Sequence, residues 1–281
     1  MTTTPAGVVI AAGGLGTRVS GWSPLLPKEF RPVGGRPGLL HVLAETAAAG
    51  VRHAVVVHHP YYTPVIDWTR QTLAPGALTR YQQLAQQPVS PDPLTGLRVD
   101  FIAQRGRYAD ITSALNGSQY LRSGHVGLVF CDNVDPEHTA VSELVGAATP
   151  GTPAVLAGAF DVRSAPSHGV IICTGTGPVR TMAGLVEKPD PAHAVELAAA
   201  YGPDNLGLLL GRVSLTPGIL RYMAATARRA RTEPRLSIAL AAYAQHHRVD
   251  VITTSTRMVD LGAPAPAADD PSYRPDTRSH P

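Results

Sequence analysis

A glycine-rich loop near the start of the chain carries the residues best suited to chemistry. The run Gly13-Gly14-Leu15-Gly16-Thr17-Arg18 follows a short apolar segment, and Lys28 stands ten residues after Arg18 in Pro27-Lys28-Glu29. Glycines let a backbone approach a ligand closely, with amide N–H groups turned toward ligand oxygens. Because a cation stands at each end of this loop, the segment is predicted to hold a polyphosphate.

Three readings of this loop differ in what they require. A Walker-type loop needs Gly-Lys-Ser/Thr where this chain has Gly16-Thr17-Arg18, so that reading fails. A dinucleotide fingerprint needs a third glycine where Val19 stands and an acid about 20 residues on. Residues 31–44 contain no acid, so this reading is weak. In the third reading, the loop resembles the signature of sugar-phosphate nucleotidyltransferases, in which G-x-G-T-R is followed by P-K-E, as it is here. The alternative to that reading is a plain strand-to-helix turn rich in glycine.

Two aspartates are candidate metal ligands. Asp132 directly follows the apolar run 126–131, and Asp260 precedes Gly262 after a second apolar stretch. A carboxylate at the carboxyl end of a strand lies where open α/β folds bind ligands, and its hard oxygens suit Mg²⁺. The alternative is that each aspartate only stabilises a turn.

A neighbouring acid and cation, Glu187 and Lys188, form the next candidate pair. They end the apolar run 179–186 and precede Pro189. Consecutive side chains at a strand end diverge, so one can accept hydroxyl groups while the other pairs with a phosphate. A solvated charge pair before proline is the alternative.

The composition is that of a globular protein and excludes several classes. Of the 281 residues, 44% are apolar and 16% charged, and the formal net charge is +3. The short arginine cluster at 228–231 gives no nucleic-acid footprint. The first residues lack the pattern of a secretory signal and no apolar run reaches membrane-spanning length, so we expect a cytoplasmic protein without a membrane partner. Cys131 and Cys173 are isolated, which indicates neither a disulfide framework nor a zinc site.

Strand-like and helix-like segments alternate along the chain, which predicts an α/β fold with a doubly wound, mostly parallel, Rossmann-like sheet. Segment 153–186 has strands without intervening helices and predicts a small antiparallel insertion. One domain is expected over 1–262, followed by a poorly ordered Pro/Ala-rich tail over 263–281. The expected strands are 7–12, 53–58, 99–104, 126–131, 153–160, 168–173, 179–186, 205–212 and 249–254, and the expected helices are 38–49, 63–73, 111–122, 137–148, 191–200, 216–230 and 235–246.

Taken in order, these motifs resemble the sugar-1-phosphate nucleotidyltransferase family, and most of all its UTP–glucose-1-phosphate uridylyltransferase branch. The resemblance runs from about Val8 to Gly262. It rests on the order and spacing of several modest motifs: GLGTR with PKE (14–18 and 27–29), Asp132, the His-Gly-Val step at 168–170, VEKP at 186–189, NLGLLLGR at 205–212 and D-x-G at 260–262.

The resemblance implies a Mg²⁺-dependent enzyme that joins a nucleoside triphosphate, UTP or dTTP first, to a sugar 1-phosphate and releases pyrophosphate. It also implies that the antiparallel insertion binds the sugar. Catalytic roles fall to Arg18, Lys28 and Lys188, and Mg²⁺ to Asp132 and Asp260. Nucleotide contacts fall to Ala12, Gly13, Gly14, Gly16, Thr17, Gln104 and Asp110, and sugar-phosphate contacts to Gly169, Glu187, Lys188 and Asn205.

The segment predicted to read the base departs from the family. Gln104 follows its strand as expected, but Asp110 stands where the family has glycine and Thr112 replaces a second small residue. An aspartate here can also act as a helix N-cap. Two alternative functions therefore stay open: a non-catalytic sugar-nucleotide sensor on the same fold, and a nicotinamide-dependent oxidoreductase. Assembly into a homo-oligomer is left open as well.

Overall fold

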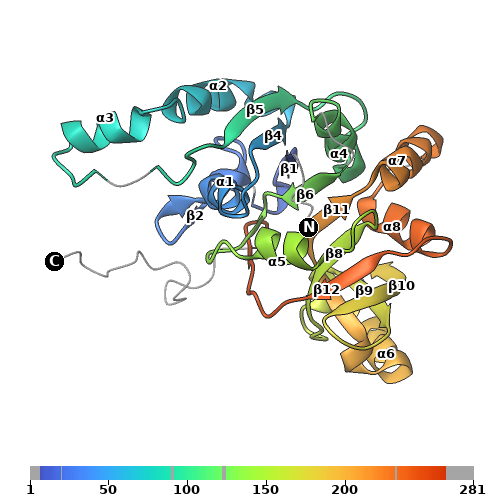
Figure 1. Cartoon of the computed structure of the whole chain (residues 1–281). Coiled ribbons are helices and arrows are strands. Elements are labelled where there is room, and N and C mark those ends of the chain that lie inside the picture. The colour runs from blue at the N-terminus through green and yellow to red at the C-terminus, as the bar shows by residue number, and fades with distance from the viewer. Residues whose placement is uncertain (1–6, 20, 90–91, 122–124, 232, 264–281) are drawn as a thin grey trace.

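A nine-stranded mixed sheet forms the centre of the protein (Figure 1). The computed structural model describes residues 7–19, 21–89, 92–121, 125–231 and 233–263, so nearly all of the predicted tail lies outside the described residues. The strands of the sheet are β1 (Val8–Ala12), β4 (His53–His58), β5 (Arg98–Ala103), β6 (Val126–Phe130), β8 (Ala154–Ala159), β9 (Gly169–Thr174), β10 (Val179–Glu187), β11 (Leu206–Leu215) and β12 (Asp250–Thr253).

The first half of the chain builds a parallel sheet in the order β5-β4-β1-β6. Strand β1 is buried on both faces: Val8 and Ile10 enter one apolar cluster, and Val9 and Ala11 enter the other. Successive side chains of a strand point to opposite faces, so a strand covered on both sides is apolar throughout. This explains the uninterrupted apolar run before the glycine loop.

The second half of the chain corrects the prediction of a mostly parallel sheet. Strand β11 pairs antiparallel with β6, β8 and β9, while β10 pairs antiparallel with β9 and β12. With the parallel pair β8 and β12, these contacts close a ring of five strands, β11-β8-β12-β10-β9. The antiparallel part is therefore half of the sheet and not a small insertion. The ring is set by pairing between strands far apart in sequence, which alternation along the chain does not reveal.

Helices cover both faces of the sheet, as the prediction of a doubly wound fold requires. Residues of α1, α2 and α5 share one apolar cluster with β1, and residues of α4, α7 and α8 share the other. A smaller cluster joins α6 to β9 and β11. The helices are α1 (Gly38–Ala48), α2 (Thr63–Thr72), α3 (Ala77–Leu84), α4 (Asp110–Ser118), α5 (Ala140–Ala147), α6 (Pro191–Tyr201), α7 (Pro217–Arg229) and α8 (Leu236–Ala244).

Each predicted strand and helix is present, with ends that differ by a few residues. The predicted helix 111–122 ends at Ser118, and its last predicted residue lies outside the described residues. Sequence reasoning missed α3, which lies at the far left of Figure 1, away from the sheet. It also missed four short strands that form two antiparallel pairs: β2 (Pro32–Val33) with β3 (Arg36–Pro37), and β7 (Asn133–Val134) with β13 (Val259–Asp260). The pairing of β7 with β13 positions residues of the candidate site.

Within the described residues, no helix combines the length and the apolar character that a membrane span requires.

Candidate active site

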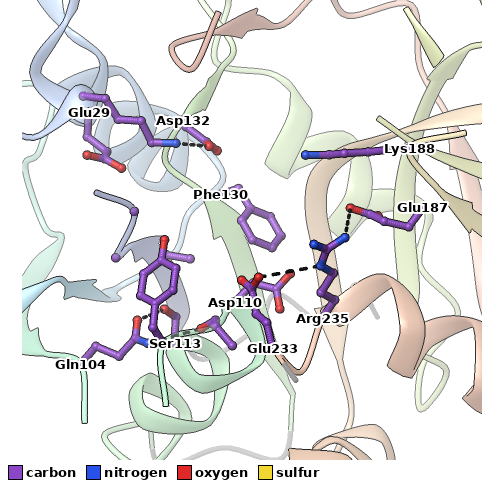
Figure 2. A pocket seen from close by; sticks show the side chains of 16 residues that line it. Glu29, Gln104, Asp110, Ser113, Phe130, Asp132, Glu187, Lys188, Glu233 and Arg235 are labelled. Carbon is purple, nitrogen blue, oxygen red and sulfur yellow. Dashed lines mark hydrogen bonds and ion pairs between the residues drawn. The ribbon is translucent and has the colours of Figure 1, made fainter. Parts of the chain in front are cut away.

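Two adjoining pockets lie where β1, β6 and β10 end, and they share Asp110, Phe130, Asp132, Glu187 and Lys188. Figure 2 shows Phe130 at the centre, with Asp132 and Glu29 on one side and Glu187 and Lys188 on the other. The first pocket is also lined by Ala11, Gly13, Gly14, Lys28, Glu29, Gln104, Tyr108, Ala109, Ser113, Glu233 and Arg235. The second is also lined by Arg18, Asn133, Ser167, His168, Gly169, Leu209, Gly211, Leu236, Ser237 and Asp260.

The glycine loop has glycine where a side chain would not fit. A β-carbon on Gly13 would lie 2.5 Å from Gln104 Oε1, inside any normal contact distance. Gly16 has φ +61°, and a β-carbon there would meet Ser23 Oγ at 2.1 Å. A positive φ of this size strains most other residues. These two glycines therefore let the loop bend and let Gln104 pack against it.

A lysine–aspartate pair lines the first pocket. Lys28 lies in the short 3₁₀ helix η2 (Lys28–Phe30), and its Nζ donates to Asp132 Oδ2 at 2.5 Å. Burial lowers the pKa of the Lys28 ammonium, but the negative charge of Asp132 and other acids outweighs burial, so this pKa is raised. Burial by itself would raise the pKa of the Asp132 carboxyl. The positive charge and hydrogen bond of Lys28 outweigh burial, so this pKa lies below its ordinary value. Both groups therefore stay charged.

The second aspartate is held beside the first by the pairing of β7 with β13. Asp260 lies opposite Asn133 in this pair, and the N–H of Leu261 donates to the carbonyl oxygen of Asp132 at 2.7 Å. Asp132, Asp260 and Arg18 line the same pocket. Two carboxylates without a third fit Mg²⁺, because Mg²⁺ commonly takes one or two protein carboxylates and completes its shell with phosphate oxygens and water. The described residues contain no group of three or more His, Cys, Asp or Glu that could hold a metal.

Gln104 is buried at the floor of the first pocket, and the chain fixes its amide. Its Nε2 lies 3.4 Å from the carbonyl oxygen of Ala109 and 3.5 Å from that of Arg107, while Oε1 accepts from Ser113 Oγ at 2.8 Å. Carbonyl oxygens accept only, so the NH₂ group must face them. The oxygen of Gln104 is therefore the atom that faces Gly13.

Asp110 ties together two helices that start at the pocket. Its Oδ1 accepts from the N–H of Ile111 at 2.6 Å and from the N–H of Leu236, the first residue of α8, at 2.8 Å. Helix N-termini present free N–H groups that favour a negative charge. Burial raises the pKa of Asp110 to about 6, opposed by these two N–H groups and reinforced by Glu233 and Glu187. Asp110 thus joins the start of α4 to the start of α8.

The far side of the site carries Glu187, Lys188 and an arginine that sequence reasoning missed. Arg235 Nη1 lies 3.9 Å from Glu187 Oε1, and its Nε lies 3.9 Å from Glu233 Oε2 (Figure 2). Lys188 has φ +44°, a conformation unusual for a residue with a side chain, and its N–H donates to the carbonyl of His168 at 3.1 Å. Such strain is found at functional sites more than elsewhere.

The structure brings together most of the predicted site residues. Gly13, Gly14, Arg18, Lys28, Gln104, Asp110, Asp132, Gly169, Glu187, Lys188 and Asp260 all line one or both pockets. Four do not: Ala12 is buried at the end of β1, Gly16 lies in the loop after it, Thr17 begins the short 3₁₀ helix η1 (Thr17–Val19), and the side chain of Asn205 donates to the carbonyl oxygen of Tyr201.

Several pocket residues were missed by sequence reasoning, among them Tyr108, Ser113, Phe130, Glu233 and Arg235. Phe130 could have been found from the sequence, because it lies in a predicted strand two residues before the candidate ligand Asp132. Glu233 lies just before a predicted helix and Arg235 is the first residue of that helix, and neither carried a signal. They reach the pocket because α8 packs on β10 and its first N–H donates to Asp110 at the start of α4.

A stretch of 104 residues is 36% identical to 2-C-methyl-D-erythritol 4-phosphate cytidylyltransferase of Cereibacter sphaeroides, and it covers 37% of this chain and 42% of that enzyme. The match thus spans about two-fifths of the relative's length.

Two solved structures have the same fold. UDP-glucose pyrophosphorylase in complex with UDP-glucose superimposes with a TM-score of 0.72 and 18% identity, covering 92% of this chain and 93% of that one. The inositol-1-phosphate CTP transferase of T. maritima superimposes with a TM-score of 0.68 and 12% identity, covering 94% of this chain and 92% of that one. At these identities the likeness concerns the fold alone.

A family model matches residues 7–265, a span that includes the glycine loop, both aspartates and the Glu187–Lys188 pair. The chain belongs to the nucleotidyl transferase family.

Proposed function

We propose that this protein transfers a nucleotidyl group from a pyrimidine nucleoside triphosphate, UTP or dTTP first, to the phosphate of a sugar 1-phosphate, with Mg²⁺ as cofactor. The proposal rests on the way in which residues distant in sequence meet at one site. Residues of the glycine loop, Lys28, Asp132, Lys188 and Asp260 come from separate parts of the chain and line two adjoining pockets. This is the set that two polyanionic substrates require.

In the proposed reaction, a phosphate oxygen of the sugar 1-phosphate forms a bond to the α-phosphorus of the triphosphate. The bond from that phosphorus to the oxygen bridging to the β-phosphorus breaks, and pyrophosphate leaves with its electron pair. The attacking phosphate is already anionic and needs no strong general base. Catalysis then consists of alignment and of offsetting the repulsion between two anions.

The residues of the two pockets divide this work. The loop amides with Lys28 and Arg18 hold the triphosphate, while Lys188 holds the sugar phosphate and Glu187 accepts sugar hydroxyl groups. Asp132 and Asp260 would hold Mg²⁺, which when bound supplies positive charge between the two substrates. Lys28 now donates to Asp132. The carboxylate that would hold the metal thus also positions the Lys28 ammonium in the first pocket.

The choice of base rests on Gln104. With its NH₂ group facing two carbonyl oxygens, Gln104 offers its oxygen to a donor on the base. Uracil and thymine present an N3–H donor, and cytosine presents a 4-amino donor. CTP is therefore a second candidate, favoured by the sequence match to a cytidylyltransferase.

A pyrophosphate-release assay tests the proposal. Purified protein would be incubated with Mg²⁺, each common nucleoside triphosphate and a panel of sugar 1-phosphates, with the Lys28→Met variant as the control preparation. We expect release with a pyrimidine triphosphate and a sugar 1-phosphate together, and none with either substrate alone. Nucleotide binding without release for any pair would favour the sensor. Membership of the nucleotidyl transferase family already favours transfer over nicotinamide-dependent oxidation.

A further inference from the structure

A buried carboxyl in the first pocket has an oxygen that nothing in the described chain satisfies. Glu29 follows Lys28 in η2, is 2% exposed and lines the pocket, and its Oε2 has no hydrogen-bond partner among the described residues. Buried polar atoms are hydrogen-bonded in the great majority of cases, and leaving one unpaired is costly. An unpaired atom at a ligand pocket points to a partner supplied by the ligand.

The neighbours of Glu29 decide which form the carboxyl takes. Burial raises the pKa of Glu29 to about 8, opposed by the Lys28 ammonium and its own backbone N–H and reinforced by Asp132 at the end of β6. A negative charge on Glu29 would also raise the pKa of three neighbouring weak acids, Tyr62, Tyr108 and Cys131. Tyr62 does not offer its proton, because its hydroxyl donates to the carbonyl oxygen of Ser23 at 2.7 Å. At neutral pH the carboxyl therefore holds a proton of its own.

A protonated carboxyl is a hydrogen-bond donor, which an ionised one is not. This difference matters in a pocket that receives a polyphosphate, since an ionised glutamate beside Lys28 would repel the ligand and cancel part of the lysine's charge. A neutral acid does neither. A carboxylic acid O–H donating to an anionic oxygen also makes a short, strong hydrogen bond.

We propose that Glu29 binds the nucleotide as a neutral acid, with its O–H donating to a phosphate oxygen beside Lys28. The assignment rests on the proposed function, in that it takes the ligand of this pocket to be a nucleoside triphosphate. It adds to the loop amides and the two cations a neutral donor whose strength depends on pH.

The test is equilibrium binding of UTP, and of CTP in parallel, across pH 6.5 to 9.5 at fixed Mg²⁺, without a sugar phosphate. Glu29→Gln keeps the shape and a donor but removes the titration. We expect wild-type affinity to fall above about pH 8, by up to tenfold per pH unit. Glu29→Gln should bind within about threefold of wild type at pH 7 and keep that affinity at pH 9. Glu29→Leu should bind about tenfold more weakly at pH 7.

Glu233→Gln is the matched control, because it removes an exposed acid from the rim of the same pocket. It should retain the wild-type fall above pH 8. Circular dichroism of each variant checks that it is folded. If Glu29→Leu does not fold, the comparison of wild type with Glu29→Gln still tests the proposal.

The outcomes separate the two proposals. If wild type and Glu29→Gln lose affinity equally at high pH, the role of Glu29 as a donor is wrong while nucleotide binding stands. If Glu29→Gln instead raises the Mg²⁺ concentration needed for binding, the residue is a metal ligand and the assignment is overturned. If wild type binds no nucleotide at any pH, the proposed function falls, and the role of Glu29 falls with it.

Discussion

Gln104 has one amide orientation open to it, because two backbone carbonyls face its nitrogen and Ser113 donates to its oxygen. A residue fixed in this way can distinguish bases, since no rotation of the amide is needed or allowed when a base arrives. The close approach of Gly13 places that oxygen at the pocket floor. Discrimination between nucleotides is therefore expected to depend on a single side chain.

Replacing Gln104 by Ala should remove this discrimination. We expect the preference for UTP or dTTP over other triphosphates to fall by about 1–3 kcal/mol in kcat/KM, because the hydrogen bond to the base is lost. Competition assays with pairs of triphosphates measure the ranking directly. Ser113→Ala, which leaves the amide in place, should change the ranking less. An unchanged ranking in Gln104→Ala would contradict the role given to Gln104.

Asp110 gives the protein a pH dependence of stability. Its pKa is raised to about 6, mainly by burial, above the ordinary value of 3.8. The folded state therefore holds this proton more tightly than the unfolded state, and its contribution to stability is present below about pH 4 and lost as pH rises through 6.

Asp110→Asn keeps the acceptor for both helix N-termini but does not ionise. Between pH 4 and 7, wild type should lose on the order of 1–3 kcal/mol of unfolding free energy relative to this variant. Urea denaturation at several pH values measures it. Parallel curves for wild type and Asp110→Asn would show that the carboxyl does not titrate in this range.

Helix α1 and strand β11 are joined by a wholly buried ion pair beneath the site. Arg212 donates to both carboxylate oxygens of Glu45, through Nε at 2.9 Å and through Nη2 at 2.6 Å. Glu45 also accepts from the N–H of Val141 in α5 at 3.0 Å. The arginine of the NLGLLLGR motif thus joins three elements and does not line the described pockets.

Removing one partner of this pair should lower the unfolding free energy far more than removing both. Arg212→Met leaves a buried carboxylate without its cation, and we expect a loss of about 3–5 kcal/mol in unfolding free energy. Glu45→Leu combined with Arg212→Met should recover most of that loss, because no charge remains buried. Urea denaturation of the single and double variants gives both values. Additive losses in the double variant would show that the charges do not interact.

The whole molecule brings together two aspartates from distant segments, Asp132 and Asp260, across one short strand pair. If they hold Mg²⁺ for the reaction, Asp132→Ala and Asp260→Ala should each lower kcat by about 10²-fold or more with folding intact. Turnover of wild type should stop when EDTA is added and return with Mg²⁺. Activity that persists in EDTA would exclude the metal role.

Arg18 and Lys188 belong to separate segments of the chain and should serve different substrates. Arg18 lines only the second pocket and lies beside Asp260 and Gly262, whereas Lys188 follows β10 and lines both pockets. Arg18→Ala should mainly raise the KM for the triphosphate, and Lys188→Ala the KM for the sugar phosphate. Steady-state kinetics with each substrate varied in turn measures the split. A rise for the same substrate in both variants would refute this division.

Much of the site could be predicted from sequence because its parts are local. The glycine loop, Lys28, Asp132 and the Glu187–Lys188 pair are each defined by a few neighbouring residues at a strand end. Glu29 was visible in the same motif, but its burial and its unpaired oxygen were not. Those properties depend on what packs around it from other segments.

The sequence by itself determined the nine strands of the main sheet, most helices and the family, since apolar periodicity and motif spacing are properties of neighbouring residues. The tertiary structure alone decided that β11 closes a ring of five strands, that Asp110 joins α4 to α8, and that Arg235 reaches the pocket. These features depend on contacts between residues far apart in the chain. Such contacts form only when the apolar faces of the helices and sheet are buried together, and no local pattern encodes which distant partner each will meet.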